Sequence, residues 1–386
     1  MHSGELLGIS HNNIKNIPGK DTMKSYIKKI LYIFALLSII LFVSCEGKPT
    51  DNIDSIQNDS LPSTDEKKEE KVPFPPKLRT WVAYWDLKDI DIELSQIAET
   101  LNSLSYFQVY FNHENELVIP EQFEKMYKII EKAELSENIT KYLTFVNDQR
   151  LEDDSFLLKD TNLLKILLAD EKSAEKHAKD IVGLTLQYGY DGLEIDYEAI
   201  RKDFDLWDKF ISFLEILKNT TKEAGLDLRV ILEPYIPYDQ IIFPDGIEYV
   251  IMCYNYYGTH SGPGPKASPS FIEEIIIKTK SLPGDVIYAI ATGGVQWDTS
   301  EKGTSLTESA ATDLALKYNT EPTRDKDSGC MVFEYYDKTG MKFDVWYADD
   351  ETLKLWINTI QVLTENENDI AIWRIGGNIS LENLTE

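Results

Sequence analysis

The chain has 386 residues, of which 42% are hydrophobic and 11% aromatic, so it can bury a sizeable core. Its formal net charge of −27 argues against binding of nucleic acid, which needs a basic face. A neutral or weakly charged partner, such as a polysaccharide, is compatible with this charge. The histidines are scattered without ligand-like spacing, so we expect no metal site and no other cofactor.

Residues 1–45 have the organisation of a secretory signal peptide. Residues 30–43 form an apolar run that is too short for a comfortable membrane span. Three basic residues precede this run: Lys24, Lys28 and Lys29. Positive charge, a short apolar stretch and then a small residue at Ser44 are typical of a signal that directs export.

The end of this signal, Leu41–Cys45, resembles the lipobox of bacterial lipoproteins, in which the cysteine is acylated. We therefore expect a protein that starts at Met23 and is anchored by a lipid on Cys45 to the membrane of the bacterial cell envelope. An ordinary cleaved signal or an uncleaved anchor helix are the alternatives. Residues 46–76 are rich in Asp, Ser, Lys, Glu and Pro and predict a disordered tether.

A folded domain is predicted over residues 77–386, where short apolar runs alternate with amphipathic stretches. Eight runs are predicted strands: Arg79–Trp85, Tyr106–Phe111, Tyr142–Val146, Gly192–Glu198, Leu228–Leu232, Tyr249–Tyr254, Val286–Ile290 and Ile370–Arg374. Six stretches between them are predicted helices: Asp91–Ser103, Glu121–Leu135, Asn162–Gly189, Phe204–Ala224, Phe271–Lys280 and Asp349–Leu363. This alternation predicts an α/β fold, a (β/α)8 TIM barrel. A doubly wound open sheet is the alternative, although no glycine-rich phosphate loop follows the first strand.

Residues 294–348 interrupt the alternation between the seventh strand and the last helix. Within them, Met331–Tyr336 and Lys342–Tyr347 are predicted to form a hairpin that turns at residues 338–340. We therefore expect a small α+β insertion at the mouth of the barrel, where active sites of this fold lie.

The segment Tyr190–Glu198 contains the candidate catalytic carboxylates. Because side chains alternate along a strand, one set shares a face: Glu194, Asp196 and Glu198. The opposite face carries an apolar set: Leu193, Ile195 and Tyr197. In a barrel the apolar set would pack against the helices and the acidic set would point inward, with Glu198 at the C-terminal, catalytic end.

Inward carboxylates this close disfavour one another's charge, so at least one proton should be retained near neutrality. A glycosidase needs such a protonated carboxylic acid to meet the leaving-group oxygen. One alternative is an edge strand whose acidic side chains face solvent. In that case the apolar set would be the only contact of this strand with the core. A calcium site is another, although calcium ligands usually come from loops richer in Asp and Asn.

This segment resembles the signature of glycoside hydrolase family 18, DGxDxDxE. Asp191, Gly192, Asp196 and Glu198 match it, and Glu194 stands where Asp is usual. This motif is highly specific for the family. Weaker likenesses to the family support it, and together they cover about residues 78–378.

Supporting likenesses come from later strands. Met252–Asn255 is similar to the family's Met-x-Tyr-Asp, with Asn255 in place of Asp. Pro263–Pro265, Val345–Tyr347 and Ala371–Gly377 resemble segments of a bacterial subgroup that includes cell-wall and spore-cortex hydrolases.

The resemblance implies substrate-assisted, retaining hydrolysis of β-1,4-linked N-acetylglucosamine polymers. Glu198 would protonate the glycosidic oxygen and later act as a base, while the sugar's own acetamide attacks the anomeric carbon. Asp196 would orient the acetamide, Tyr254 would hold its oxygen, and Trp373 would form the floor beneath the sugar. Further candidate substrate-binding residues are motif neighbours and aromatic residues near strand ends: Asp191, Glu194, Met252, Asn255, Trp85 and Trp297.

For the aromatic residues, simple core packing remains the alternative. Chitin, peptidoglycan and the chitobiose core of N-glycans all carry the required acetamide, and the protein is expected to be a monomer. Two other functions stay open: a glycan-binding relative without turnover, and an adhesive surface lipoprotein that uses the barrel as a scaffold. Cys253 and Cys330 could form a disulfide or remain buried thiols.

Overall fold

A computed structural model describes the folded domain from Lys77 onward, except residues 285, 366–368 and 386. The predicted signal (1–45), Cys45 and the predicted tether (46–76) lie outside the described residues. In the described part of the chain, none of the helices combines the length and apolar character needed to span a membrane.

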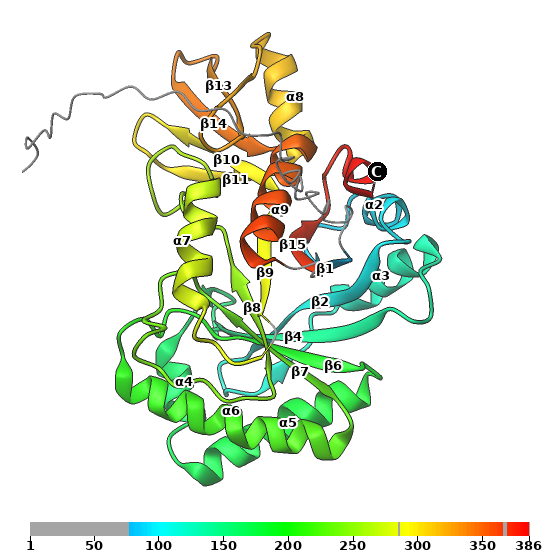
Figure 1. Ribbon diagram of the computed structural model, residues 1–386, viewed down its shortest axis with the longest axis vertical. Helices are drawn as coiled ribbons and strands as arrows, with labels where there is room; N and C mark the ends of the chain where they lie inside the picture. Colours follow the sequence, from blue (N-terminus) through cyan, green and yellow to red (C-terminus); the bar gives the residue numbers. More distant parts are fainter. Residues whose placement is uncertain (1–76, 285, 366–368, 386) are drawn as a thin grey trace, which may run out of the picture. The chain divides into compact units, whose positions relative to one another are not determined.

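Eight parallel strands form a closed barrel (Figure 1), which confirms the predicted TIM barrel. They are β1 (Leu78–Ala83), β2 (Leu101–Phe111), β4 (Thr140–Arg150), β6 (Gly192–Asp196), β7 (Asp227–Leu232), β8 (Glu248–Met252), β9 (Val286–Ala291) and β15 (Ile370–Ile375). The barrel closes because β1 pairs with both β2 and β15. Two short antiparallel strands extend β2 and β4: β3 (Leu117–Val118) and β5 (Phe156–Leu157).

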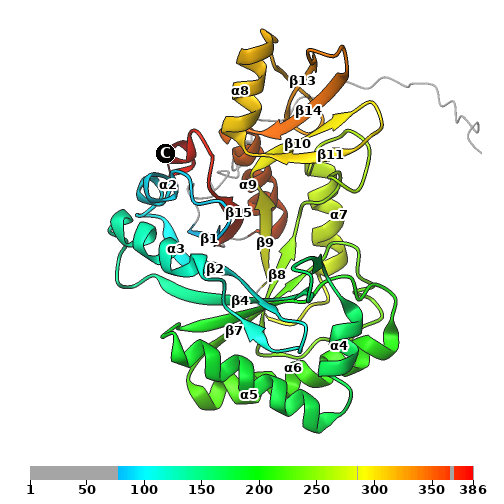
Figure 2. The same cartoon turned by 180° about the vertical axis from the view of Figure 1, so that it is seen from behind.

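Helices surround most of the barrel: α2 (Ile90–Gln96), α3 (Gln122–Ile130), α4 (Thr161–Leu167), α5 (Glu171–Gln187), α6 (Phe204–Ala224), α7 (Pro269–Thr279) and α9 (Asp350–Thr364). Two 3₁₀ helices complete the set: η1 (Glu131–Ala133) and η2 (Leu381–Thr385). Residues 233–247, all of them described, connect β7 to β8 by turns without a helix. Figures 1 and 2 show α5 and α6 side by side along one flank of the barrel.

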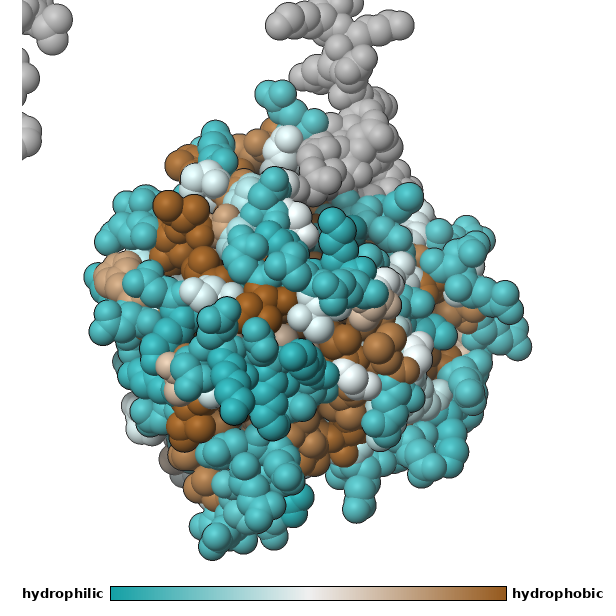
Figure 3. Space-filling view, turned by 90° about the horizontal axis from the view of Figure 1, so that it is seen from below, coloured by the Kyte–Doolittle hydropathy of each residue, from teal (hydrophilic) through white to brown (hydrophobic). Residues whose placement is uncertain are grey.

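Helix α6 shows how local sequence fixes an element. It begins after Asp203, whose side chain accepts a hydrogen bond from the backbone N–H of Leu206, and it ends at Gly225 in the left-handed conformation. Its buried residues recur at helical spacing: Leu206, Phe210, Phe213, Leu214 and Leu217. Its exposed residues are polar except for Phe204. The face of the molecule in Figure 3 is mainly hydrophilic, with hydrophobic residues showing in between.

Two of the predicted helices are wrong in their limits. The first was expected over Asp91–Ser103, but α2 ends at Gln96 and β2 already begins at Leu101. The third, Asn162–Gly189, is two helices, because Asp170 caps α5 by accepting a hydrogen bond from the N–H of Ser173. A cap in the middle of an apolar pattern starts a new helix.

The insertion between β9 and α9 is a five-stranded antiparallel sheet with one helix against it. Its elements are β10 (Gly293–Asp298), β11 (Gly303–Leu306), α8 (Glu308–Tyr318), β12 (Thr323–Arg324), β13 (Met331–Tyr336) and β14 (Lys342–Ala348). The predicted hairpin is the β13–β14 pair. The first half of the sheet was not predicted, because β10 opens with two glycines and β11 is short and polar. A small core of its own lies between α8 and the sheet.

The barrel has two separate apolar layers. Side chains that point outward from the strands pack against the helices in the main core. Side chains that point inward form a smaller cluster that includes Trp81, Phe107, Val146, Ile231, Met252 and Tyr254. At the base of the barrel, where the strands begin, the carbonyl of Lys77 accepts a hydrogen bond from Ile370 N–H. The catalytic end is the opposite one, where the strands end.

Gly294 provides a test of how closely β10 and β14 approach. A Cβ at this position would lie 2.0 Å from the carbonyl oxygen of Trp346, a backbone atom that cannot rotate away. We expect Gly294→Ala to lower the free energy of unfolding by about 1–3 kcal/mol. Gly183→Ala is the control, because Gly183 lies in α5 and a Cβ added there would have nothing within 4 Å. It should raise the free energy of unfolding by about 0.5–1 kcal/mol. Equal effects of both changes in urea denaturation would contradict the close approach.

Candidate active site

A cavity of about 200 Å³ opens at the C-terminal end of the barrel. Seven of the eight barrel strands, or the segments that follow them, contribute to its lining: Trp81, Phe107, Lys159, Asp196, Glu198, Ile231, Met252, Tyr254, Asn255 and Trp373. Six of these residues belong to the set proposed from the sequence: Asp196, Glu198, Met252, Tyr254, Asn255 and Trp373. This is the end of the fold at which TIM-barrel active sites lie.

The strand β6 and the residues just after it position the acids by alternation. Leu193, Ile195 and Tyr197 are buried in the outer core, which leaves the acidic side chains facing inward. The hydroxyl of Tyr197 lies 2.7 Å from Nε2 of His177 on α5. Burial lowers the pKa of His177 to about 3, so this ring is neutral and ties the end of the strand to the helix layer.

The backbone at Glu198 is fixed from the neighbouring strand. Its N–H donates to Oδ1 of Asn147 at 2.9 Å, and its carbonyl accepts from Nδ2 of the same side chain at 3.1 Å. Asn147 is itself buried on β4. Glu198, which lies two residues past the end of β6, is therefore held as firmly as a strand residue.

Burial raises the pKa of the Glu198 carboxyl to about 7. The charge and hydrogen bonding of Glu233 raise it further, whereas the ion pair with Lys159 opposes the shift. Glu233 follows β7 and accepts a hydrogen bond from the N–H of Ala199 at 2.7 Å. A carboxyl with this pKa can both donate and accept a proton near neutral pH.

Asp196 is buried beside Glu198, and its pKa is raised well above the ordinary value by burial and then by the charge of Glu198. Its Oδ1 has no hydrogen-bond partner among the described residues. Asp196 also lines the cavity, and a buried carboxylate oxygen without a partner is uncommon in folded proteins. Burial and then the charges of Asp196 and Glu198 raise the pKa of Tyr254, which stays a neutral hydrogen-bond donor.

Aromatic rings enclose the acids. Trp373 at the end of β15 makes edge contacts with Trp81 and Phe107, with ring centroids 5.9 and 4.7 Å apart. Phe107 in turn contacts Trp85, which is half exposed and lies outside the cavity lining. Three of these rings therefore line the cavity beside the acids, and Trp85 lies outside its lining.

Glu194 does not line the cavity. Its carboxylate accepts four hydrogen bonds in the barrel interior, from Trp81 Nε1 (2.8 Å), Ser105 Oγ (2.7 Å), Thr144 Oγ1 (2.7 Å) and Arg229 Nη1 (3.2 Å). Arg229 is almost fully buried, and it also pairs with Glu248, which pairs with Arg79 at 2.6 Å. Glu194 is thus the inner end of a chain of ion pairs that stabilises the barrel below the acids.

Two other proposed substrate-binding residues also lie away from the cavity. Asp191 precedes β6 at the base, where its carboxylate accepts from the N–H of Lys141 at 2.8 Å. Trp297 is fully buried in the insertion, and its Nε1 donates to the carbonyls of Gly258 and Ser261. Both side chains are therefore committed to structure. Cys253 and Cys330 are buried free thiols.

The sequence pattern did not single out three polar residues that shape the site: Asn147, Lys159 and Glu233. Each follows or ends a different strand from the one that carries the motif. Asn147 and Glu233 do stand at the ends of predicted strands, a position typical of barrel active-site residues, and this signal could have identified them.

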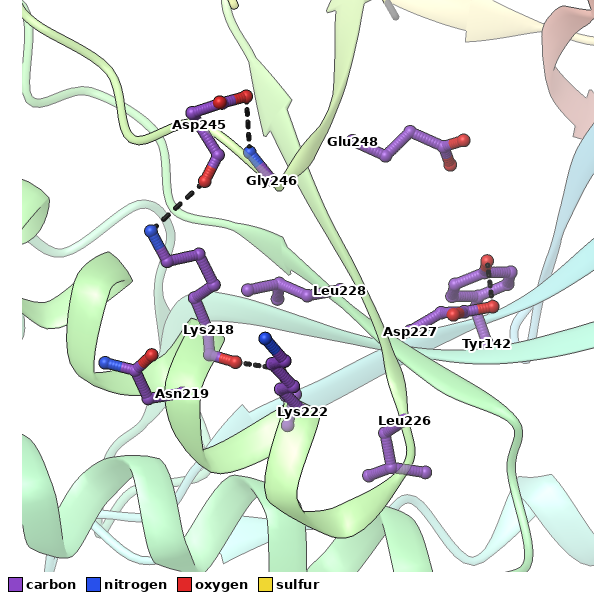
Figure 4. Close-up of a pocket in the computed structure, with 11 residues that line it drawn as sticks. Tyr142, Lys218, Asn219, Lys222, Leu226, Asp227, Leu228, Asp245, Gly246 and Glu248 are labelled. Carbon is purple, nitrogen blue, oxygen red and sulfur yellow. Dashed lines mark hydrogen bonds between the residues drawn. The ribbon is translucent and has the colours of Figure 1, made fainter. Parts of the chain in front are cut away.

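A larger cavity, of about 700 Å³, lies at the opposite end of the barrel (Figure 4). Its lining includes the starts of β7 and β8, at Asp227 and Glu248. The amino group of Lys218 is satisfied there by the carbonyl of Asp245 at 3.1 Å. This end of a TIM barrel serves stability, so the smaller cavity is the candidate active site.

No family model matches the chain. By sequence, it is 25% identical to an uncharacterised glycosylase of Bacillus subtilis, YvbX, over 66% of this chain and 78% of that protein. It is 22% identical to a cortical fragment-lytic enzyme of Bacillus anthracis, over 76% of this chain and 71% of that enzyme. By structure, it resembles a chitinase of Chromobacterium violaceum, with a TM-score of 0.65 and 14% identity over 80% of this chain and 97% of that one. The structural likeness establishes a shared fold.

The raised pKa of Glu198 predicts a pH-dependent effect on stability. In the unfolded chain this carboxyl loses its proton near pH 4.5, but in the folded protein only near pH 7. The contribution of Glu198 to the free energy of unfolding therefore decreases as the pH rises from 4.5 to 7. Above pH 7 this decrease is complete. We expect Glu198→Gln to raise the free energy of unfolding, relative to wild type, by roughly 1–3 kcal/mol more at pH 8 than at pH 5.

The control for this measurement is Glu137→Gln, since Glu137 is exposed. Chemical denaturation of this variant at both pH values gives the effect of replacing an exposed carboxyl by an amide, which is subtracted from that of Glu198→Gln. A Glu198→Gln difference that is independent of pH after this subtraction would show that Glu198 ionises normally.

Proposed function

We propose that this chain is a glycoside hydrolase that cleaves β-1,4-linked N-acetylglucosamine polymers of the chitin or peptidoglycan type. One observation carries the proposal: Glu198 and Asp196, both with raised pKa values, line one cavity that Trp373 and other aromatic rings enclose. Similarity to proteins described as a glycosylase and as cortical fragment-lytic enzymes supports it.

The proposed mechanism is substrate-assisted and retaining. Glu198 donates its proton to the glycosidic oxygen as the bond between this oxygen and the anomeric carbon breaks, and the leaving sugar departs as an alcohol. The acetamide oxygen of the remaining sugar bonds to the anomeric carbon in the same step, giving an oxazolinium ion. Asp196 accepts a hydrogen bond from the acetamide N–H through its free Oδ1 and stabilises the positive charge that develops. Tyr254 donates to the acetamide oxygen, and Glu198 then takes a proton from the water that opens the ring.

The buried environment suits this chemistry. A reactive oxazolinium ion must be protected from stray water, and the enclosing rings of Trp81, Phe107 and Trp373 provide that protection. The cavity is smaller than the roughly 300–1,000 Å³ of pockets for drug-sized ligands, so it suits the one sugar that reacts. The rest of a polymer would lie along the rim, near Trp85.

Glu198→Gln tests the proposal directly. The amide cannot donate a proton as a carboxylic acid does, so turnover should fall at least about 100-fold with folding and glycan binding retained. The measurement is mass spectrometry of products from chitin oligomers and purified peptidoglycan, with wild type and variant in parallel. Binding without products from wild-type protein would instead indicate the alternative, a glycan-binding protein without turnover. Comparable kcat in the variant would remove Glu198 from the mechanism.

The pH profile gives a second test. Since Glu198 must be protonated to act as an acid, kcat/KM should fall as the pH rises through about 7. Glu233 helps to raise this pKa, and its neutral replacement Glu233→Gln still offers a carbonyl to the N–H of Ala199. The basic limb of the variant's profile should therefore move to lower pH. A basic limb that stays in place would show that Glu233 does not tune the acid.

A further inference from the structure

Lys159 places a cation against the catalytic acid. Its ammonium group forms an ion pair with Glu198 Oε2, and its side chain is 43% exposed, so it lies at the mouth of the cavity. The backbone is fixed as well, because Lys159 N–H donates to Oδ1 of Asp148 at 2.8 Å and Asp160 N–H donates to the carbonyl of Asn147 at 2.8 Å. The position of this cation is therefore built into the loop after β5.

This ion pair conflicts with the proposed chemistry. Glu198 must carry a proton when it meets the glycosidic oxygen, and a neutral carboxylic acid no longer balances the ammonium charge. The other carboxylates near Lys159 already have roles. Asp148 accepts from Lys159 N–H and from Gln108, and Glu233 accepts from Ala199 N–H. Asp196, whose charge also acts on Lys159, is the proposed partner of the substrate's acetamide N–H. A carboxylate brought by the substrate would restore the balance as Glu198 takes up its proton.

The position of that carboxylate follows from the atoms next to the glycosidic oxygen. In the leaving sugar, the oxygen that Glu198 protonates is bonded to C4. In N-acetylmuramic acid, the neighbouring C3 carries a lactyl ether that ends in a carboxylate. A residue that contacts Glu198 is thus within reach of this group. In chitin the same position is a neutral hydroxyl, which cannot replace Glu198 as an ion-pair partner.

We propose that Lys159 is a specificity determinant that binds a carboxylate carried on C3 of the leaving sugar, so that the substrate is an anionic glycan with N-acetylglucosamine linked to N-acetylmuramic acid. This inference rests on the proposed function and selects among its polymers. The carboxylate has two sources: the free lactyl group of peptide-free strands, or the stem peptide that extends it.

The test compares kcat/KM for three tetrasaccharides: chitotetraose, a peptide-free N-acetylglucosamine–N-acetylmuramic acid repeat, and the same repeat with its stem peptides. Lys159→Met should lower the ratio of anionic to neutral kcat/KM about tenfold, the scale of one partly exposed charge-assisted hydrogen bond. Lys159→Arg should keep most of the preference. Lys165→Met is the matched control, because Lys165 is similarly exposed and pairs with Asp203 at 2.8 Å outside the cavity lining.

A binding measurement separates recognition from turnover. In a Glu198→Gln background, adding Lys159→Met should lower the ratio of anionic to neutral affinity about tenfold in calorimetry. If the affinity falls for the peptide-free glycan, the lactyl group supplies the carboxylate. If it falls for the peptide-bearing glycan, the stem peptide supplies it. Equal changes for all three glycans would overturn the role of Lys159 and leave the proposed hydrolase intact. Absence of wild-type turnover on every glycan would overturn the proposed function, and with it this inference.

Discussion

Three carboxylates at β6 point into the barrel, and each needs partners that compensate for the burial of its charge. These partners differ between the deepest acid and the outermost one. Glu194, the deepest, accepts four hydrogen bonds and pairs with the buried Arg229. Asp196 has one oxygen without a partner among the described residues, and its raised pKa reflects burial next to Glu198. Glu198, the outermost, exchanges between a proton and Lys159. The deepest acid is therefore fully paired by donors fixed in the barrel, and the two acids that line the cavity keep an unpartnered oxygen or a raised pKa that chemistry can use.

Glu194 stands where the signature that this segment resembles has Asp, and its contacts explain the longer side chain. The carboxylate of Glu194 reaches donors from β1, β2, β4 and β7, and one of them is a guanidinium, so its role is to hold the strands of the barrel together. Asn255 has a comparable local reason: its φ of 66° lies in the left-handed region, which Asn tolerates better than most residues.

Much of the fold and the centre of the site could be predicted, because their signals are local. The alternation in Tyr190–Glu198 and the eight apolar runs indicated the barrel and the inward acids before any contact was known. Partners such as Lys159, Glu233 and Arg229 could not be predicted with the same force, because they come from other strands and meet the acids only after the barrel closes. Trp297 shows the opposite failure: an aromatic residue near a strand end was expected at the substrate, but two carbonyl acceptors hold it in the core.

The hydrogen bond between Ile370 and Lys77 places the start of the folded domain at the base of the barrel, while the acids lie at the other end. Anything joined through the residues before Lys77 thus attaches behind the cavity. The first strand is therefore entered from the end away from the acids, which leaves the mouth of the cavity to the C-terminal ends of the strands and the segments that follow them.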